Sequence, residues 1–547
     1  MFMTKKASRF AALALTVAML GTLTLQSAAV GVSKAKEENS KIKNVIVLIP
    51  DGMSVDDVTL ARWYKSYDAV SGTVDTSVSL ALDKMASGLV RTYWEKAGVT
   101  GAITDSAPAA TAMATGVKSN DKYIGVTYDQ KPLATVLEAA KSTGRATGLV
   151  ATSNIQHATP AGYSSHYPDR SKYEILAEQQ VYNDIDVVYG AGSKYLAGRA
   201  DNENMINTLK LNGYEYVTTR DQMEAVTSGK VWGMFAASDM AYEMDRDETA
   251  AAQPSLAEMT DSAIRLLSQD EDGFFLMVEG SKIDWAAHAN DPIGVISDVL
   301  AFDDAVSVAL DYAKAHQDTI VIAMTDHGNG GLTIGNADTS STYSSDNLIK
   351  FIAPLKKATL TGEGVEKMLN ADRSNAEEVM STYYGISDLS DDEIAAIKAA
   401  PAGSMNYVVG PMISKRAYLG WTTTGHTGED VVLFTYLPGD ERITGTIDNT
   451  DVADICAGVW GVDLEALTDE LYINASAAFE AKGATVTADN SNESNPKLVV
   501  TKGSTTLIIP ESKNYVYVNG SQFLFDSVTV NVKGVFYVSR EVVSLIA

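Results

Sequence analysis

Long runs of apolar residues recur along the chain, and each is followed by polar residues. The first run covers residues 44–50 and is followed directly by Asp51 and Gly52. Comparable runs cover residues 146–152, 185–189, 274–278 and 319–324. A run in which nearly every residue is apolar is typical of a strand buried on both faces, as in a parallel sheet covered by helices.

The segments between these runs are long enough for crossover helices, for example over residues 132–142 and 256–269. We therefore expect an α/β fold with a doubly wound, mostly parallel sheet flanked by helices. The strand pattern fades over residues 331–424, which we interpret as an insertion over the rim of the sheet. A further strand at 431–436 and helix-like segments that end at residue 481 complete a large domain over residues 42–481.

The composition changes after the large domain. The polar segment 482–496 is interpreted as a linker. Residues 497–547 contain short β-rich runs with an Asn519-Gly520 turn, which predicts a small β-rich module. This tail resembles the small domain found at the N-terminus of some copper amine oxidases, and it carries no pattern of metal ligands.

The N-terminus has the pattern of a secretory signal. Lys5, Lys6 and Arg9 precede an apolar run over residues 10–25, and small residues follow. We interpret residues 1–29 as a signal peptide, with cleavage between residues 29 and 35. The alternative, a membrane anchor, is disfavoured because the run is short and interrupted by threonines. The mature chain is expected to be exported, to the periplasm, the cell surface or the medium, without a transmembrane segment.

Charge and cysteine content limit the partners of the chain. The net charge of −27 argues against a surface that binds nucleic acid or anionic membranes. Cys456 is the only cysteine, so no disulfide forms within the chain. An anionic substrate would need concentrated positive charge at its site, which metal ions and an arginine are able to supply.

Polar residues at the ends of the predicted strands are the candidates for chemistry. Parallel sheets bind ligands beyond the carboxyl ends of their strands. The i, i+4 spacing of Asp284 and His288 directs both side chains to one point on a helix, and His426 lies in a glycine-flanked turn. Carboxylates and imidazoles without thiolates suit a catalytic zinc ion, whereas a site of oxygen atoms alone suits magnesium.

Ser106 begins an alanine-rich segment that predicts a helix ending near Gly116. Free N–H groups and the dipole at a helix N-terminus favour a phosphate group, so a phosphorylated serine is favourable there. The alternative is that Ser106 only caps the helix, which is a common role of serine.

The motifs over about residues 42–480 resemble those of the alkaline phosphatase family in type and in order. They are Pro50-Asp51-Gly52-Met53, Asp105-Ser106-Ala107, Gln156-His157-Ala158-Thr159-Pro160, Arg170, Glu279 with Asp284 and His288, Asp326-His327, and His426-Thr427-Gly428. Family members are often homodimers, so the resemblance also raises the expectation of a homodimer.

The resemblance implies an enzyme that hydrolyses small-molecule phosphate monoesters through a phosphoserine on Ser106, with Arg170 clamping the phosphate. It also implies two zinc ions and one magnesium ion. One zinc would be held by Asp284, His288 and His426, and the other by Asp51, Asp326 and His327 with Ser106 at its open position. Magnesium would be held by Asp51, Thr159 and Glu279. His157 and Trp285 would lie beside the magnesium, at positions that vary within the family.

Two alternatives remain open at this point. Related two-metal enzymes act as phosphodiesterases, sulfatases or phosphosugar mutases, but Ser106 lacks the Cys/Ser-x-Pro-x-Arg context of sulfatases. Glu279 with Thr159 indicates a third metal site, which favours a monoesterase. The second alternative is a non-catalytic surface protein. Since none of the inferred ligands is missing, we restrict that idea to attachment of the enzyme to the cell envelope through residues 497–547.

Overall fold

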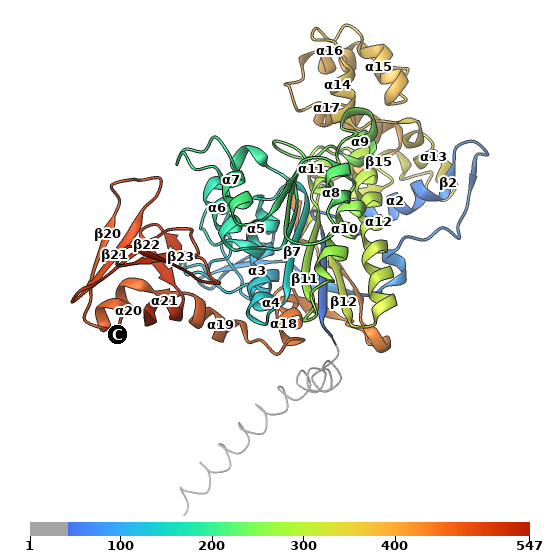
Figure 1. Cartoon of the computed structure of the whole chain (residues 1–547). Coiled ribbons are helices and arrows are strands. Elements are labelled where there is room, and N and C mark those ends of the chain that lie inside the picture. The colour runs from blue at the N-terminus through green and yellow to red at the C-terminus, as the bar shows by residue number, and fades with distance from the viewer. Residues whose placement is uncertain (1–41) are drawn as a thin grey trace, which may run out of the picture.

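The structure is a computed structural model that describes residues 42–547 (Figure 1). The signal peptide expected over residues 1–29 lies outside this part of the chain. Among the helices of residues 42–547, none is long and apolar enough to cross a membrane.

A ten-stranded sheet forms the centre of the large domain. β17 runs antiparallel to both of its neighbours, and every other neighbouring pair in this sheet is parallel. In spatial order the strands are β18 (Thr446–Asp448), β4 (Ala86–Arg91), β17 (Val431–Tyr436), β12 (Thr319–Met324), β1 (Asn44–Pro50), β11 (Phe274–Gly280), β7 (Ala146–Asn154), β8 (Val187–Ala191), β10 (Val231–Met234) and β9 (Glu215–Val217).

Helices cover both faces of this sheet, so alternate residues of one strand enter different cores. Ile46 and Leu48 of β1 pack into the core beneath α2 (Val55–Ser66), α10 (Leu256–Leu267) and α12 (Pro292–His316). Val45, Val47 and Ile49 pack into the core beneath α3 (Ser106–Thr115), α4 (Val136–Ser142) and α18 (Asp451–Gly458). Burial on both faces explains why the run is apolar at every position.

Further helices surround the sheet, and short strand pairs lie in its connections. The helices are α5 (Ala158–Ser164), α6 (Tyr173–Tyr182), α7 (Met205–Leu211), α8 (Arg220–Ala225), α9 (Glu243–Thr249) and α11 (Lys282–His288). The short strands are β2 (Tyr67–Asp68), β3 (Thr73–Val74), β5 (Trp94–Lys96), β6 (Val99–Gly101), β13 (Gly328–Asn329) and β16 (His426–Thr427). The fold class expected from the sequence, a mostly parallel α/β sheet flanked by helices, is confirmed.

Residues 331–424, expected to be an insertion, form a helical layer whose apolar core also includes Leu60 of α2 and Ile293 and Ile296 of α12. Figure 1 shows this layer above the sheet, next to α9 and α11. Its core contains Ile352, Val365, Met380 and Val409. Its elements are β14 (Leu332–Ile334), α13 (Leu348–Ile352), α14 (Gly362–Met368), α15 (Ala376–Tyr383), α16 (Asp391–Ala399), α17 (Asn406–Arg416) and β15 (Leu419–Trp421).

The C-terminal module is larger than the range 497–547 predicted from the sequence. Residues 482–496, interpreted from the sequence as a linker, contain β20 (Thr485–Asp489), which pairs along its whole length with β21 (Lys497–Lys502). Phe479 of α20 packs in the same core as Leu498 and Val500. The module consists of α19 (Leu464–Leu471), β19 (Ile473–Asn474), α20 (Ala475–Ala481), β20 (Thr485–Asp489), β21 (Lys497–Lys502), β22 (Thr505–Pro510), β23 (Tyr515–Val518), β24 (Ser521–Leu524), β25 (Val530–Val532), β26 (Val535–Val538) and α21 (Arg540–Ser544).

A buried ion-pair network joins the module to the large domain. Lys513 is 3% exposed, and its Nζ contacts the carboxylates of Glu178, on α6, and Glu203. Nη2 of Arg199 lies 3.1 Å from the Glu178 carboxylate on the other side. Buried charges of this kind are stable only when each is paired, so this contact fixes the module against α6.

Candidate active site

The candidate site lies at one edge of the sheet, where β12, β1, β11 and β7 end. β1 lies between β11 and β12, and Ile49 stands opposite Glu279 in the parallel register. Asp51 follows β1, and Asp326 follows β12 after one residue. Because the carboxyl ends of parallel strands meet at the same edge, motifs that are far apart in the sequence converge here.

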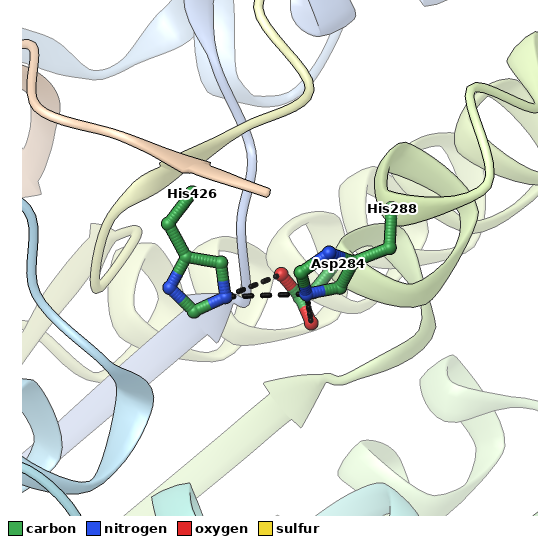
Figure 2. Close-up of side chains that lie close together, drawn as sticks. All are labelled: Asp284, His288 and His426. Carbon is green, nitrogen blue, oxygen red and sulfur yellow. Dashed lines mark hydrogen bonds and ion pairs between the residues drawn. The ribbon is translucent and has the colours of Figure 1, made fainter. Parts of the chain in front are cut away.

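Asp284, His288 and His426, assigned above to one zinc ion, converge in the structure (Figure 2). Nε2 of His288 lies 3.4 Å from Oδ2 of Asp284, and Nε2 of His426 lies 3.6 Å from Oδ1. The i, i+4 spacing places Asp284 and His288 on one face of α11. His426 lies on β16. This strand pairs with β13, which begins directly after the Asp326-His327 motif that follows β12.

The hydrogen bonds of the two imidazoles determine which nitrogen carries the proton. Nδ1 of His288 lies 2.8 Å from the carbonyl oxygen of Thr424, and Nδ1 of His426 lies 2.8 Å from that of Thr104. A carbonyl oxygen only accepts, so each Nδ1 donates and each neutral ring presents a lone pair at Nε2. The two Nε2 atoms are 3.2 Å apart. Two lone pairs so close repel unless a cation contacts both, so these residues fit a metal ion.

Asp51, Asp326 and His327 form a second group, and all three are fully buried. Nε2 of His327 lies 3.2 Å from Oδ2 of Asp326 and 3.7 Å from Oδ1 of Asp51. The N–H groups of Gly52 and His327 donate to Oδ1 of Asp326, which leaves Oδ2 facing the group. Within residues 42–547 neither oxygen of Asp51 has a hydrogen-bond partner. Since a buried, unpaired carboxylate is costly, this group also fits a cation.

Ser106 is the first residue of α3, and Asp105 rather than Ser106 caps the helix. The Asp105 side chain accepts a hydrogen bond from the Ala107 N–H at 3.3 Å. The Ser106 hydroxyl is therefore not occupied in capping, which removes the alternative stated above. Instead, Oγ of Ser106 lies 3.3 Å from Nε2 of His327, and the residue is 2% exposed.

Glu279 and Thr159 complete a third group around Asp51. Oε1 of Glu279 and Oγ1 of Thr159 are buried without a hydrogen-bond partner in the described part of the chain. Burial raises the pKa of Glu279 to about 7. Burial, together with the carboxylates of Asp326, Asp284 and Glu279, also holds the pKa of Asp51 well above its usual range. This concentration of unpaired carboxyl oxygens is the chemistry that a hard divalent cation satisfies.

His157 also offers a nitrogen close to Asp51 and Glu279, but its hydrogen bond argues against a role as a ligand. Nη2 of Arg170 donates to Nε2 of His157 at 3.0 Å. Burial, and then the Arg170 charge, lower the pKa of His157 to about 3, so the ring is neutral. A neutral ring that accepts at Nε2 carries its proton at Nδ1 and has no lone pair left for a metal ion. This geometry supports a role in orienting Arg170.

Arg170 is held from two sides. Its Nη1 lies 2.5 Å from Oδ1 of Asp105, the cap of α3, so the guanidinium is tied to the helical turn that carries Ser106. Trp285 is half-buried and packs edge-on against the His157 ring, with the ring centroids 5.8 Å apart. Arg170 is thus fixed beside the first turn of α3, which begins with Ser106.

Asn329 is a site residue that the sequence analysis missed. Its Nδ2 donates to Oδ1 of Asp284 at 2.6 Å and to the Asp284 carbonyl at 3.0 Å. These bonds fix the rotamer of a carboxylate that both His288 and His426 approach. In the sequence, an asparagine in a glycine-rich segment is typical of a turn. Its position beside Asp284 becomes apparent only from the structure, in which β13 pairs with β16.

Comparison with known proteins identifies the family. A family model described as alkaline phosphatase matches residues 42–461. The chain belongs to the alkaline phosphatase family. The resemblance drawn from the motifs is therefore confirmed, and with it the expectation of a phosphatase.

Relatives and solved structures of the alkaline phosphatase family cover most of the chain. Alkaline phosphatase 4 of Bacillus subtilis is 38% identical over 433 residues, which span 77% of this chain and 90% of that protein. The crystal structure of a cold-active alkaline phosphatase from Shewanella sp. gives a TM-score of 0.67 at 29% identity, over 77% of this chain and 100% of that chain. A mutant alkaline phosphatase from the Antarctic bacterium TAB5, solved with magnesium in its M3 site, gives a TM-score of 0.56 at 26% identity, over 77% of this chain and 99% of that chain.

A second family model, described as a copper amine oxidase N-terminal domain, matches residues 463–546. The match agrees with the similarity noted from the sequence of the tail. It begins one residue before α19, well before the module boundary at residue 497 that the sequence analysis expects. The homodimer and the attachment to the cell envelope stay predictions.

Proposed function

We propose that this alkaline phosphatase family member hydrolyses phosphate monoesters to an alcohol and inorganic phosphate, with Ser106 as the nucleophile. The observation that carries the proposal is the position of the Ser106 hydroxyl. It lies at the N-terminus of α3, it is free of the capping role, and it is 3.3 Å from Nε2 of His327. The N–H groups of the first turn and the helix dipole favour a phosphate group at this place.

The proposed reaction has two displacements at phosphorus. Oγ of Ser106 forms a bond to phosphorus while the ester bond to the alcohol oxygen breaks, and the Ser106 proton passes to solvent as the departing alkoxide takes one up. Water then attacks the phosphoserine from the opposite side, and release of phosphate restores the hydroxyl. Two inversions give net retention at phosphorus.

We propose two zinc ions and one magnesium ion at the site. The groups Asp284, His288, His426 and Asp51, Asp326, His327 mix imidazole with carboxylate, which suits zinc, and the oxygen atoms of Asp51, Thr159 and Glu279 suit magnesium. Such ions, when bound, stabilise the charge on phosphate oxygens and lower the pKa of an adjoining hydroxyl or water.

Arg170 supplies the remaining positive charge for the substrate. Its guanidinium, oriented by Asp105 and His157, would hold two non-bridging phosphate oxygens during both displacements. Local positive charge is needed because the chain as a whole carries −27. We propose that the metal ions, Arg170 and the N-terminus of α3 together overcome the repulsion between the protein and an anionic substrate.

The proposal is tested by comparing a monoester with a diester of the same chromogenic phenol at alkaline pH. We expect rapid release of the phenol from 4-nitrophenyl phosphate and a kcat/KM lower by several orders of magnitude for bis(4-nitrophenyl) phosphate. At alkaline pH the diester carries one negative charge, whereas the monoester carries two. The diester also places a bulky second group where Arg170 would hold a phosphate oxygen. Preference for the diester would favour the phosphodiesterase alternative and would contradict the proposal.

Asn329→Ala is expected to weaken binding of the ion held by Asp284 by about 10- to 100-fold, which is the usual effect of removing a partner of a metal ligand. The substitution removes both bonds that fix the Asp284 rotamer while leaving the three ligands in place. The change in affinity is measured by titrating the metal-free protein with zinc and recording the activity at each concentration. Asn336→Ala, which changes a cap in the insertion, serves as the control and should leave the titration unchanged. A titration of Asn329→Ala identical to that of the unmodified chain would contradict the role.

A further inference from the structure

A cleft of about 290 Å³ opens beside Trp285, between the large domain and the helical insertion. Figure 1 shows the two layers that form it, with α14 and α17 next to α9 and α11. The large domain contributes Tyr242 and Trp285 to its walls, and the insertion contributes Glu363, Glu366, Asn406 and Tyr407. The cleft thus has aromatic rings and hydrogen-bonding groups from both layers.

The cleft adjoins the phosphate site through Trp285. Trp285 follows Asp284 on α11, and its ring contacts His157, the residue that holds Arg170. A group that extends from a phosphate held by Arg170 toward α17 would enter this cleft.

The carboxylates of the cleft are already paired with cations. Glu363 lies 2.8 Å from Nζ of the buried Lys282. Glu366 lies 3.4 Å from a guanidinium nitrogen of Arg373 and accepts a hydrogen bond from the Gly403 N–H at 2.9 Å. Because each charge is compensated, the cleft has little attraction for a cation and keeps fixed acceptor oxygens for neutral donors.

Building on the proposed function, we propose that this cleft binds the alcohol part of the substrate and favours sugar or polyol monophosphates. The faces of Trp285 and Tyr407 would cover the C–H groups of the polyol, while carboxylate oxygens of the cleft accept hydrogen bonds from its hydroxyls. Tyr407 is 50% exposed, so its ring has free surface for such a contact. The insertion would thereby set the substrate preference of a site that otherwise grips only phosphate.

The experiment compares glucose 6-phosphate with methyl phosphate, whose alcohol is too small to enter the cleft, by measuring phosphate release. Tyr407→Ala is expected to raise KM for glucose 6-phosphate by about threefold to tenfold, the usual contribution of an aromatic contact, with kcat unchanged. Kinetic constants for methyl phosphate should stay the same. Tyr407→Phe keeps the ring and should behave as the unmodified chain, and Tyr128→Ala removes an equally exposed tyrosine outside the cleft as the matched control.

Three outcomes overturn the inference. Equal constants for glucose 6-phosphate in the unmodified chain and in Tyr407→Ala would show that the alcohol lies elsewhere. A larger loss with phosphoethanolamine than with glucose 6-phosphate would identify a subsite for cations instead. If methyl phosphate is hydrolysed while either of these results is found, the proposed function stands and only this inference fails. If no monoester is hydrolysed, the proposed function fails and the inference fails with it.

Discussion

Ser106→Ala is expected to lower kcat for 4-nitrophenyl phosphate by about 10,000-fold or more, because the first displacement has no nucleophile without the hydroxyl. The fold should survive, since Asp105 still caps α3 and alanine is the best helix former. Rapid quenching followed by mass spectrometry should detect a phosphoserine in the unmodified chain and none in the variant. Metal analysis should find the same metal content in both.

A second serine provides the control for this result. Ser255 caps α10, and its hydroxyl accepts a hydrogen bond from the Glu258 N–H at 3.1 Å. Ser255→Ala should lower the free energy of unfolding by about 1 kcal/mol and leave kcat unchanged. Comparing the two variants distinguishes the loss of a helix cap from the loss of the proposed nucleophile. Ser255 caps its own helix, whereas the helix that begins with Ser106 is capped by Asp105. Retention of most of the activity in Ser106→Ala would exclude the phosphoserine route.

The sequence predicts the centre of the sheet well because burial on both faces leaves a continuous apolar signal. β1, β7, β11 and β12 all coincide with the predicted runs to within two residues. The sequence does not predict β9, at one edge of the sheet, or β4, which lies next to the other edge, since a short strand with exposed positions has no such run. Apolar runs therefore report the position of a strand within the sheet as well as its presence.

The module boundary shows what local patterns leave undetermined. β20 has only partly exposed or exposed residues, so the polar composition of residues 482–496 is typical of a linker. Its status as a strand comes from pairing with β21, and the burial of Phe479 comes from packing against residues beyond residue 497. Both are long-range contacts that no window of sequence contains.

Most of the candidate site was predictable because its residues follow the ends of buried strands or share one face of a helix. The motifs identify Asp51, Asp284 and Asp326 without any structure. The orienting contacts were not predictable, since Asn329 reaches Asp284 through a two-residue strand pair and Asp105 takes the capping role from Ser106. Chemistry-bearing residues thus leave a signal in the sequence, while the residues that position them do so only through the fold.

Removal of metal ions with a chelator is expected to abolish hydrolysis of 4-nitrophenyl phosphate and also to lower the melting temperature. The stability loss follows from the carboxylates of Asp51, Glu279 and Asp326, which are fully buried and close together. Without cations these groups repel one another and stay unpaired, which disfavours the folded state. Ions present at about a thousand times their dissociation constant stabilise a folded protein by about 4 kcal/mol, so the shift should be readily measured by calorimetry.

Adding the metals back separates the sites. Zinc alone should restore part of the activity, and zinc with magnesium should restore all of it, because the mixed imidazole–carboxylate groups and the all-oxygen group select different ions. Ser106→Ala should show the same chelator-dependent loss of melting temperature although it is inactive, since it keeps every carboxylate and imidazole of the three groups. Activity that survives complete removal of the metal ions would contradict the metal-dependent mechanism. A melting temperature unchanged by the chelator would show that the buried carboxylates are neutralised by protons rather than by metal ions.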